Sequence, residues 1–233
     1  MASAVLRGER KEGVSDLVIL PDAERLARAA ARRFVSLASA AIGERGRFVV
    51  ALSGGSTPRP TYRRLAREPY AAAFDWSRAD VFWGDERCVP LDHPDSNYRM
   101  AREAVLDRVA VPTGQVHRIK GELPPQEAAA AYRRELKGVL GENGRFDLIL
   151  LGLGADGHTA SLFPGTAAVE ERADSVVPVY VERLKAWRVT LTLPILNSAR
   201  HVIFLVSGEP PREQRPKADK TSTDASLAPD ADE

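Results

Sequence analysis

Two titratable side chains, Asp156 and His158, stand in a glycine-rich turn directly after a short apolar run, residues 148–151. The run is too short for a buried helix and is flanked by glycine, so it is typical of a strand buried on both faces of a parallel sheet. Open α/β sheets bind their ligands at the carboxyl ends of the strands. The pair is therefore a candidate for acid–base chemistry; the alternative for His158 is an imidazole that only satisfies a carbonyl of the turn.

A second candidate site is the loop after another apolar run, residues 48–52. Its glycines leave backbone N–H groups free, its hydroxyls add donors, and Pro58 favours a helix start immediately afterwards. These features together predict a phosphate-binding loop without a Walker lysine. The alternative is a capped turn that binds nothing. The candidate binding residues are Ser53, Gly54, Gly55, Ser56 and Thr57.

Charged residues follow a third apolar run, residues 80–83. Taken alone, the sequence G-D-E-R after this run is more typical of a solvated loop. Its place at a strand's carboxyl end makes Asp85 and Arg87 candidates for the same site. Lys185 and Arg188 bracket a predicted turn between two later strands and are candidate cations for a bound anion, although such turns are often only solvated.

Residues 152–157 have the sequence G-L-G-A-D-G, which matches the G-x-G-x-x-G pattern of dinucleotide-binding loops. That pattern is meaningful when a helix follows and an acidic residue ends the next strand. Here Pro164 limits a following helix to barely two turns, and the acidic residues at 170, 171 and 174 have no strand before them. The context disfavours a nicotinamide, and no cofactor is expected.

Strand and helix patterns alternate along the chain, which predicts an α/β protein. Asp22 and Ser96 are each placed to cap a helix. The predicted strands cover residues 17–20, 48–52, 80–83, 116–119, 148–151, 176–181, 188–193 and 201–206. The predicted helices cover residues 23–44, 97–109 and 126–140.

The composition excludes several classes of protein. A chain of 233 residues with 44% hydrophobic and 28% charged residues is ordinary for a globular protein. Its 33 basic and 32 acidic residues give a formal charge of +1, with no basic block for nucleic acid. The single cysteine, Cys88, excludes an intrachain disulfide, and no zinc-binding spacing occurs, so no metal is expected. Without a signal peptide or membrane span, a cytoplasmic protein with no membrane contact and no obligate protein partner is expected.

The two ends differ in composition from the middle of the chain. Residues 1–13 are small, charged and without periodicity, and are expected to form a flexible tail. Residues 14–208 are expected to form a single α/β domain. Residues 209–233 contain one large apolar residue, Leu227, and are expected to be a disordered polar tail because they cannot bury a core.

Four motifs follow the predicted strands in order: L-S-G-G-S-T-P at 52–58, W-G-D-E-R at 83–87 with S-N-Y at 96–98, G-L-G-A-D-G-H-T-A-S-L-F-P at 152–164, and R-V-T-L-T at 188–192. Over residues 17–208 the chain resembles the glucosamine-6-phosphate isomerase/6-phosphogluconolactonase family. The resemblance implies a doubly wound, mostly parallel sheet with helices on both faces, a Rossmann-like three-layer sandwich. It also implies hydrolysis of 6-phospho-D-glucono-1,5-lactone in the oxidative pentose phosphate pathway, without metal or cofactor.

The resemblance also implies roles for the candidate residues. Opening a lactone requires an activated water and a stabilised oxyanion. His158 would be the general base, since a free imidazole titrates near ~6.5 and a positioned base contributes ~10²–10⁴ in rate. Asp156 would orient the ring or bind substrate hydroxyls, and Arg87 would donate to the oxyanion or to the phosphate. The loop at 53–57 would hold the 6-phosphate, with Lys185 or Arg188 supplying charge.

The isomerase branch of the family resembles G-x-D-G-H-I-A-F-N-E and has a tyrosine after the D-E pair. This chain has T-A-S-L-F-P after His158 and has Arg87 after that pair, which favours the lactonase branch. Asp85 holds the position of the isomerase's catalytic carboxylate and is included as a candidate on that ground. An aldose–ketose isomerase or deaminase of amino-sugar phosphates is the alternative.

Lactonases of the family usually continue after the strand that ends at Gly208 with a glycine–lysine turn, a helix and a closing strand. Residues 209–233 contain none of these elements. Apolar surface would then be left on the sheet, so we expect lowered stability or association through that surface. The second alternative is a protein that keeps the sugar-phosphate site but no longer catalyses a reaction.

Overall fold

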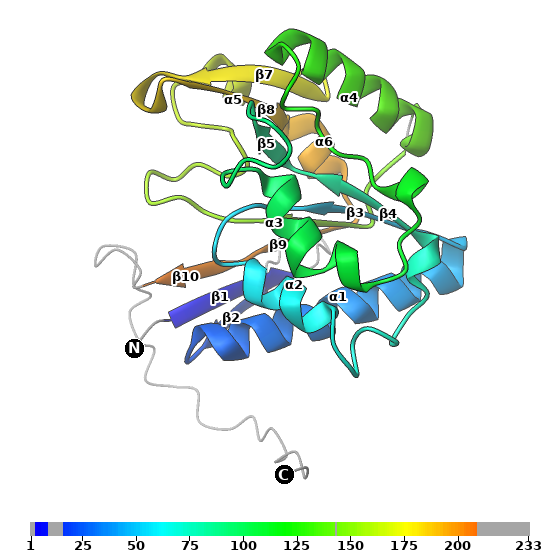
Figure 1. Ribbon diagram of the computed structural model, residues 1–233. Coiled ribbons are helices and arrows are strands. Elements are labelled where there is room, and N and C mark those ends of the chain that lie inside the picture. The colour runs from blue at the N-terminus through cyan, green and yellow to red at the C-terminus, as the bar shows by residue number, and fades with distance from the viewer. Residues whose placement is uncertain (1–2, 9–15, 143, 209–233) are drawn as a thin grey trace.

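The computed structural model describes residues 3–8, 16–142 and 144–208 (Figure 1). Its centre is a four-stranded parallel sheet in the order β4-β3-β6-β9. All residues of β3, β4 and β6 are buried, which explains why β3 and β6 are continuous apolar runs and β4 is apolar except for Asp80. The four strands are β4 (Ala79–Trp83), β3 (Phe48–Leu52), β6 (Leu148–Leu151) and β9 (His201–Phe204).

Helices cover both faces of this sheet. Figure 1 shows α1 and α2 on one side of the central strands and α4 and α6 on the other, which is the doubly wound arrangement expected. The sequence order explains it, because the chain crosses from β3 to β4 on one face and from β6 to β9 on the other. The helices are α1 (Ala23–Arg45), α2 (Arg59–Leu65), α3 (Asn97–Ala104), α4 (Pro125–Leu140), α5 (Ala167–Glu170) and α6 (Leu193–Ser198).

The amphipathic pattern of α1 packs it on the sheet. Its buried face includes Leu26, Phe34 and Leu37, as the helical spacing predicts. The Phe34 ring meets the Phe48 ring of β3 edge to face, with centroids 5.3 Å apart, an arrangement worth about 0.5–1.5 kcal/mol beyond simple burial. The helix begins at a confirmed N-cap, because the Asp22 carboxylate accepts a hydrogen bond from Arg25 N at 2.7 Å.

A second, antiparallel sheet extends from the carboxyl ends of the central strands, in the order β5-β8-β7. Gly84 joins the two sheets: its N–H donates to Leu52 O and its carbonyl accepts from Leu191 N, each at 2.9 Å. The charged run after β4 is therefore a strand whose first two residues are buried, not a solvated loop. The strands are β5 (Asp85–Arg87), β8 (Ala186–Leu191) and β7 (Val176–Val181).

A third sheet of three antiparallel strands, in the order β10-β1-β2, lies beside α1 (Figure 1). For residues 3–8 it corrects the prediction of a flexible tail over residues 1–13, because β1 pairs with strands on both of its sides. The rest of that predicted tail lies outside the described residues. The prediction of a disordered tail at 209–233 falls outside the described residues. The three strands are β1 (Ser3–Gly8), β2 (Asp16–Leu20) and β10 (Val206–Gly208).

Several predicted boundaries differ from the structure. The strand predicted at 116–119 is only a single bridge from Val116 to Val81, because one hydrogen bond, His117 N to Val81 O, joins it to β4. The helix predicted at 97–109 ends at Ala104 and continues as a 3-10 turn at Leu106–Arg108. The lowered stability, or association of copies of the chain through apolar surface on the sheet, that we expect from the sequence stays a prediction. The remaining 3-10 turns are Trp76–Arg78, Thr113–Gln115 and Glu182–Leu184.

A buried polar network links β4 to α4. His117 lies between two carboxylates, with Nε2 2.9 Å from Asp80 Oδ1 and Nδ1 3.0 Å from Glu135 Oε1. Its ring also stacks on Phe82 at 4.3 Å. Burial alone would lower the pKa of His117, but the hydrogen bonds to Asp80 and Glu135 outweigh it, so the pKa is raised.

No helix in the described part of the chain has the length and apolarity needed to cross a membrane.

Candidate active site

An open cleft of about 230 Å³ lies where the loops after β3, β6 and β9 meet the ends of β5 and β8. Its volume lies just below the usual range of about 300–1,000 Å³ for ligand pockets, which suits a single small metabolite. Lys185 does not line it, because it is exposed at the end of the turn at Glu182–Leu184. The predicted residues that do line the cleft are Ser53, Gly54, Gly55, Ser56, Thr57, Asp85, Arg87, His158 and Arg188.

His158 is held by two contacts. Its Nδ1 is hydrogen-bonded to a carboxylate oxygen of Asp156, and its ring stacks on Phe163 with centroids 4.2 Å apart. A carboxylate can only accept, so it selects the tautomer with the proton on Nδ1 and leaves the Nε2 lone pair to take a proton. This hydrogen bond also lowers the pKa of Asp156. Asp156 does not line the cleft and acts on it through the ring.

The glycine turn must approach the His158 ring closely. A Cβ on Gly154 would lie 2.1 Å from His158 Nδ1 and 2.2 Å from Cε1, which no packing tolerates. Gly154 N also donates to the His158 carbonyl at 2.8 Å, and Gly157 has a φ of +82°. The glycines therefore allow the imidazole to occupy its position. The turn continues into a tight loop and not a long helix, as the sequence context indicated.

Arg183 reaches the same cluster and was not a predicted site residue. Its Nη2 contacts the second carboxylate oxygen of Asp156, and its guanidinium lies 5.1 Å from the centre of the Phe163 ring. Arg183 and Lys185 are both cations of the same turn, so charge alone does not indicate which of them contacts Asp156. The 3-10 turn at Glu182–Leu184 breaks the strand alternation here, so no sequence period indicates which cation faces the site.

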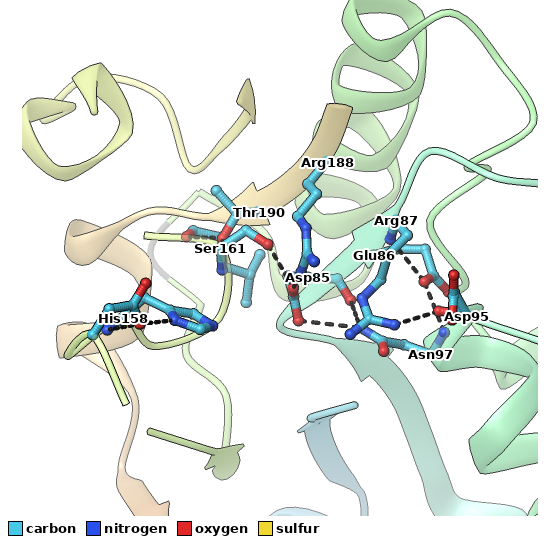
Figure 2. A network of polar contacts seen from close by, with 11 residues as sticks. Asp85, Glu86, Arg87, Asp95, Asn97, His158, Ser161, Arg188 and Thr190 are labelled. Carbon is cyan, nitrogen blue, oxygen red and sulfur yellow. Dashed lines mark hydrogen bonds and ion pairs between the residues drawn. The ribbon is translucent and has the colours of Figure 1, made fainter. Parts of the chain in front are cut away.

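Asp85 is the centre of a buried network (Figure 2). One oxygen accepts from Ser161 Oγ at 2.6 Å and lies 3.8 Å from Arg188 Nη1. The other accepts from Asn97 Nδ2 at 3.2 Å. The carboxylate is only 6% exposed and is occupied on both oxygens. These contacts suit an anchor that joins three segments of the cleft wall better than a group that transfers protons.

Glu86 is a second buried carboxylate, 3% exposed, that the sequence did not indicate as part of the site. It accepts hydrogen bonds from the backbone N–H groups of Arg87, Asn97 and Tyr98 at 2.7–2.8 Å, and from Ser96 Oγ at 3.1 Å. Burial raises the pKa of Glu86, against the effect of these donors. The carboxylate ties β5 to the start of α3, whose N-cap at Ser96 is confirmed.

Arg87 and Arg188 are direct partners across β5 and β8. Figure 2 shows their guanidinium groups beside Asp85, with His158 on the other side of the view. Arg87 donates to the Asp95 carbonyl, but the Nε atoms of both arginines are buried with no hydrogen-bond partner among the described residues. Burial lowers the pKa of Arg188 and the charge of Arg87 adds to this, while Asp85 opposes it. Like charges placed directly opposite destabilise a strand pair, so this pair is suited to an anion.

The loop at 53–58 packs against the same network. A Cβ on Gly54 would lie 1.7 Å from Asn97 Oδ1, and Gly55 has a φ of +94°. The buried Ser53 Oγ has no partner among the described residues. Helix α2 begins at Arg59, directly after Pro58 as the sequence predicts, and among the described residues no side chain caps its first turn. The loop contributes glycine backbone and hydroxyl groups to the cleft.

Comparison with known proteins gives consistent matches. The family model described as glucosamine-6-phosphate isomerases/6-phosphogluconolactonase matches residues 21–229. A 6-phosphogluconolactonase of a Synechocystis species is 48% identical over 173 residues, 72% of this chain and 70% of the relative. A rice protein named probable 6-phosphogluconolactonase 4, chloroplastic, is 42% identical over 206 residues, 82% of this chain but 62% of the relative's length.

Solved structures agree. A crystal structure of a 6-phosphogluconolactonase from Thermotoga maritima superposes with a TM-score of 0.68 at 33% identity, covering 77% of this chain and 78% of that one. It shares the parallel sheet flanked by helices. The family model covers most of the sequence, and the similarity extends to the fold. The chain therefore belongs to the glucosamine-6-phosphate isomerase/6-phosphogluconolactonase family.

Proposed function

We propose that this chain hydrolyses 6-phospho-D-glucono-1,5-lactone to 6-phosphogluconate, with His158 as the general base. The names of the relatives support the reaction. The observation that carries the assignment is an imidazole bonded to Asp156 in the same cleft as a half-buried arginine pair that no carboxylate fully neutralises. A base and an anion site in one small cleft are what a phosphorylated lactone requires.

The reaction would proceed in two steps. His158 Nε2 takes a proton from water while the water oxygen bonds to the lactone carbonyl carbon, which places a negative charge on the carbonyl oxygen. The tetrahedral intermediate then collapses, the bond to the ring oxygen breaks, and the imidazolium returns its proton to that oxygen. Asp156 stabilises the imidazolium between the two steps, so one residue serves as base and then as acid.

The charges of the cleft would bind the substrate's anionic groups. We assign the 6-phosphate to Arg188 and to the hydroxyl and backbone donors of residues 53–57. Arg87, opposite Arg188, supplies the second positive charge, to the phosphate or to the developing oxyanion. Arginine pairs two donors with two oxygens of a phosphate, which makes it suited to this group. Lys185 has no part in this assignment because of its exposed position.

The aldose–ketose isomerase is a less suitable function for this cleft. That reaction would use a carboxylate at Asp85 for proton transfer, and Asp85 is held by Ser161, Asn97 and Arg188. An ammonia-coupled assay with amino-sugar phosphate would detect that activity, and we expect none. A sugar-phosphate binder without turnover would bind 6-phosphogluconate but leave the lactone at its spontaneous rate. A cytoplasmic location stays a prediction; the rice relative is named as chloroplastic.

The test is lactone consumption by the purified chain. The lactone is generated in place from glucose 6-phosphate, and its spontaneous hydrolysis is subtracted. We expect acceleration that is proportional to protein concentration. Ligand binding without acceleration, from protein shown to be folded, would favour the binder over the enzyme.

A further inference from the structure

Arg183, Asp156 and His158 form a chain of contacts that lies on one aromatic ring. Asp156 uses one carboxylate oxygen for His158 Nδ1 and the other for Arg183 Nη2. The Phe163 ring lies under both ends, 4.2 Å from the imidazole and 5.1 Å from the guanidinium. The three polar residues come from two segments, the turn after β6 and the turn between β7 and β8.

Asp156 needs a second contact to hold its orientation. It belongs to an exposed turn in which Gly154 and Gly157 flank it, and Gly157 has a left-handed φ of +82°. Apart from Arg183, the carboxylate accepts only from His158 among the described residues, through the ring and through a long 3.4 Å contact to the backbone N–H. Held by these contacts on one oxygen alone, it can rotate about its own side-chain bonds and take up water in place of the ring. Arg183 occupies the other oxygen and comes from a different turn, so it restricts that rotation.

We propose that Arg183 is a positioning residue that acts on His158 through Asp156, and that it makes no contact with the substrate. This inference rests on the proposed function. Arg183 does not line the cleft, in contrast to Arg188, which lies over the same Phe163 ring at 5.6 Å. The lowered pKa of Asp156, caused first by its hydrogen bond to His158, is consistent with a carboxylate that stays ionised in this arrangement.

The contacts of Arg183 give the proposal a measurable direction. Without the guanidinium, one oxygen of Asp156 loses its partner and the carboxylate can turn away from His158 Nδ1. A smaller share of His158 then has the proton on Nδ1 and a free lone pair on Nε2. The loss should appear in kcat and not in KM, because Arg183 does not line the cleft.

The experiment compares Arg183→Gln with Arg183→Lys and with a matched control, Lys185→Gln. The control removes one positive charge from the same turn at a residue that does not reach Asp156. An exposed ion pair is worth up to a factor of about 5, and Arg183 is 56% exposed on its side chain. We expect Arg183→Gln to lower kcat about 2- to 5-fold at unchanged KM.

The two other variants test whether the effect requires a positive charge at residue 183 and not elsewhere in the turn. Arg183→Lys keeps the charge and should keep kcat near the wild-type value, and Lys185→Gln should match the wild type in kcat and KM. Nitrogen-15 NMR of histidine adds a readout that needs no turnover: Arg183→Gln should reduce the share of the Nδ1–H tautomer of His158, identified by its loss in His158→Ala.

Two results would overturn the proposal. One is a rise in KM alone, which would place Arg183 on the substrate. The other is an active Arg183→Gln protein with the wild-type kcat and the wild-type share of the Nδ1–H tautomer. Failure of the proposed function is distinct from both, because it would appear as a wild type without lactonase activity while the NMR comparison still reports on the position of the ring.

Discussion

The substitution Arg188→Met should raise the stability of the free protein and lower its activity. The substitution keeps an unbranched side chain over Phe163 and removes the charge that lies directly opposite Arg87. In the free protein this guanidinium is poorly compensated. Its side chain is 14% exposed, its Nε has no partner among the described residues, and its nearest carboxylate oxygen, on Asp85, is 3.8 Å away.

The magnitude follows from these contacts. Like charges directly opposite cost roughly 0.2–1 kcal/mol, and a buried donor without a partner costs about 1–3 kcal/mol. The ion pair with Asp85 and the contact with the Phe163 ring each offset up to about 1 kcal/mol. We therefore expect the free variant to be more stable than the wild type by about 1 kcal/mol, which raises Tm by about 2–4 °C.

Catalysis should change in the opposite direction. A hydrogen bond to a charged group contributes about 1.5–3 kcal/mol, so losing the Arg188 contact to the phosphate should lower kcat/KM about 10- to 150-fold. Unphosphorylated glucono-1,5-lactone, which lacks the phosphate, should be hydrolysed within about 3-fold of the wild-type rate by this reasoning.

Thermal unfolding without ligand and steady-state kinetics with both lactones are sufficient to check this. Lys185→Met is the control, because its exposed charge should affect neither quantity. The reasoning is refuted if the free Arg188→Met protein is clearly less stable than the wild type, or if kcat/KM for the phosphorylated lactone is unchanged.

Three further predictions concern other parts of the structure. Gly154→Ala should displace the His158 ring and lower kcat at least about 10-fold, since a misplaced base loses much of its ~10²–10⁴ contribution. Gly138→Ala, on α4 and away from the cleft, where a Cβ meets nothing within 4 Å, should keep its activity in the same assay. Asp85→Ala should lower the free energy of unfolding by about 3 kcal/mol in urea, because it leaves buried partners unsatisfied. The raised pKa of His117 contributes stability that is complete below ~6.5 and is lost as pH rises through its folded value; urea titrations across pH should show this loss, and His117→Gln should remove it.

The sequence predicts the central sheet well because burial there determines residue type directly. β3 and β6 are buried on both faces and are continuous apolar runs, so their predicted bounds match the structure. The helical period of α1 is equally informative, since Leu26, Phe34 and Leu37 share one buried face. β1 was missed because its pairing with β10 joins Ser3 to Gly208, which is distant in sequence, and its composition shows no apolar period.

The site residues also fall into two groups, those that a local sequence pattern predicts and those that depend on tertiary structure. Asp156 and His158 are two residues apart, so their contact is determined by a local turn and could be predicted. The opposition of Arg87 and Arg188 depends on the register of β5 against β8, which no local pattern specifies. The burial of Glu86 within a run of charges is likewise a result of tertiary packing.

The most direct measurement is hydrolysis of 6-phosphogluconolactone, generated in place, by the wild type and by His158→Ala, with thermal unfolding to show that both are folded. We predict acceleration by the wild type and a loss of about 10²–10⁴ in the variant, leaving little above the spontaneous rate. Equal acceleration by the two proteins would contradict the role of His158, and no acceleration by the folded wild type would contradict the lactonase function itself.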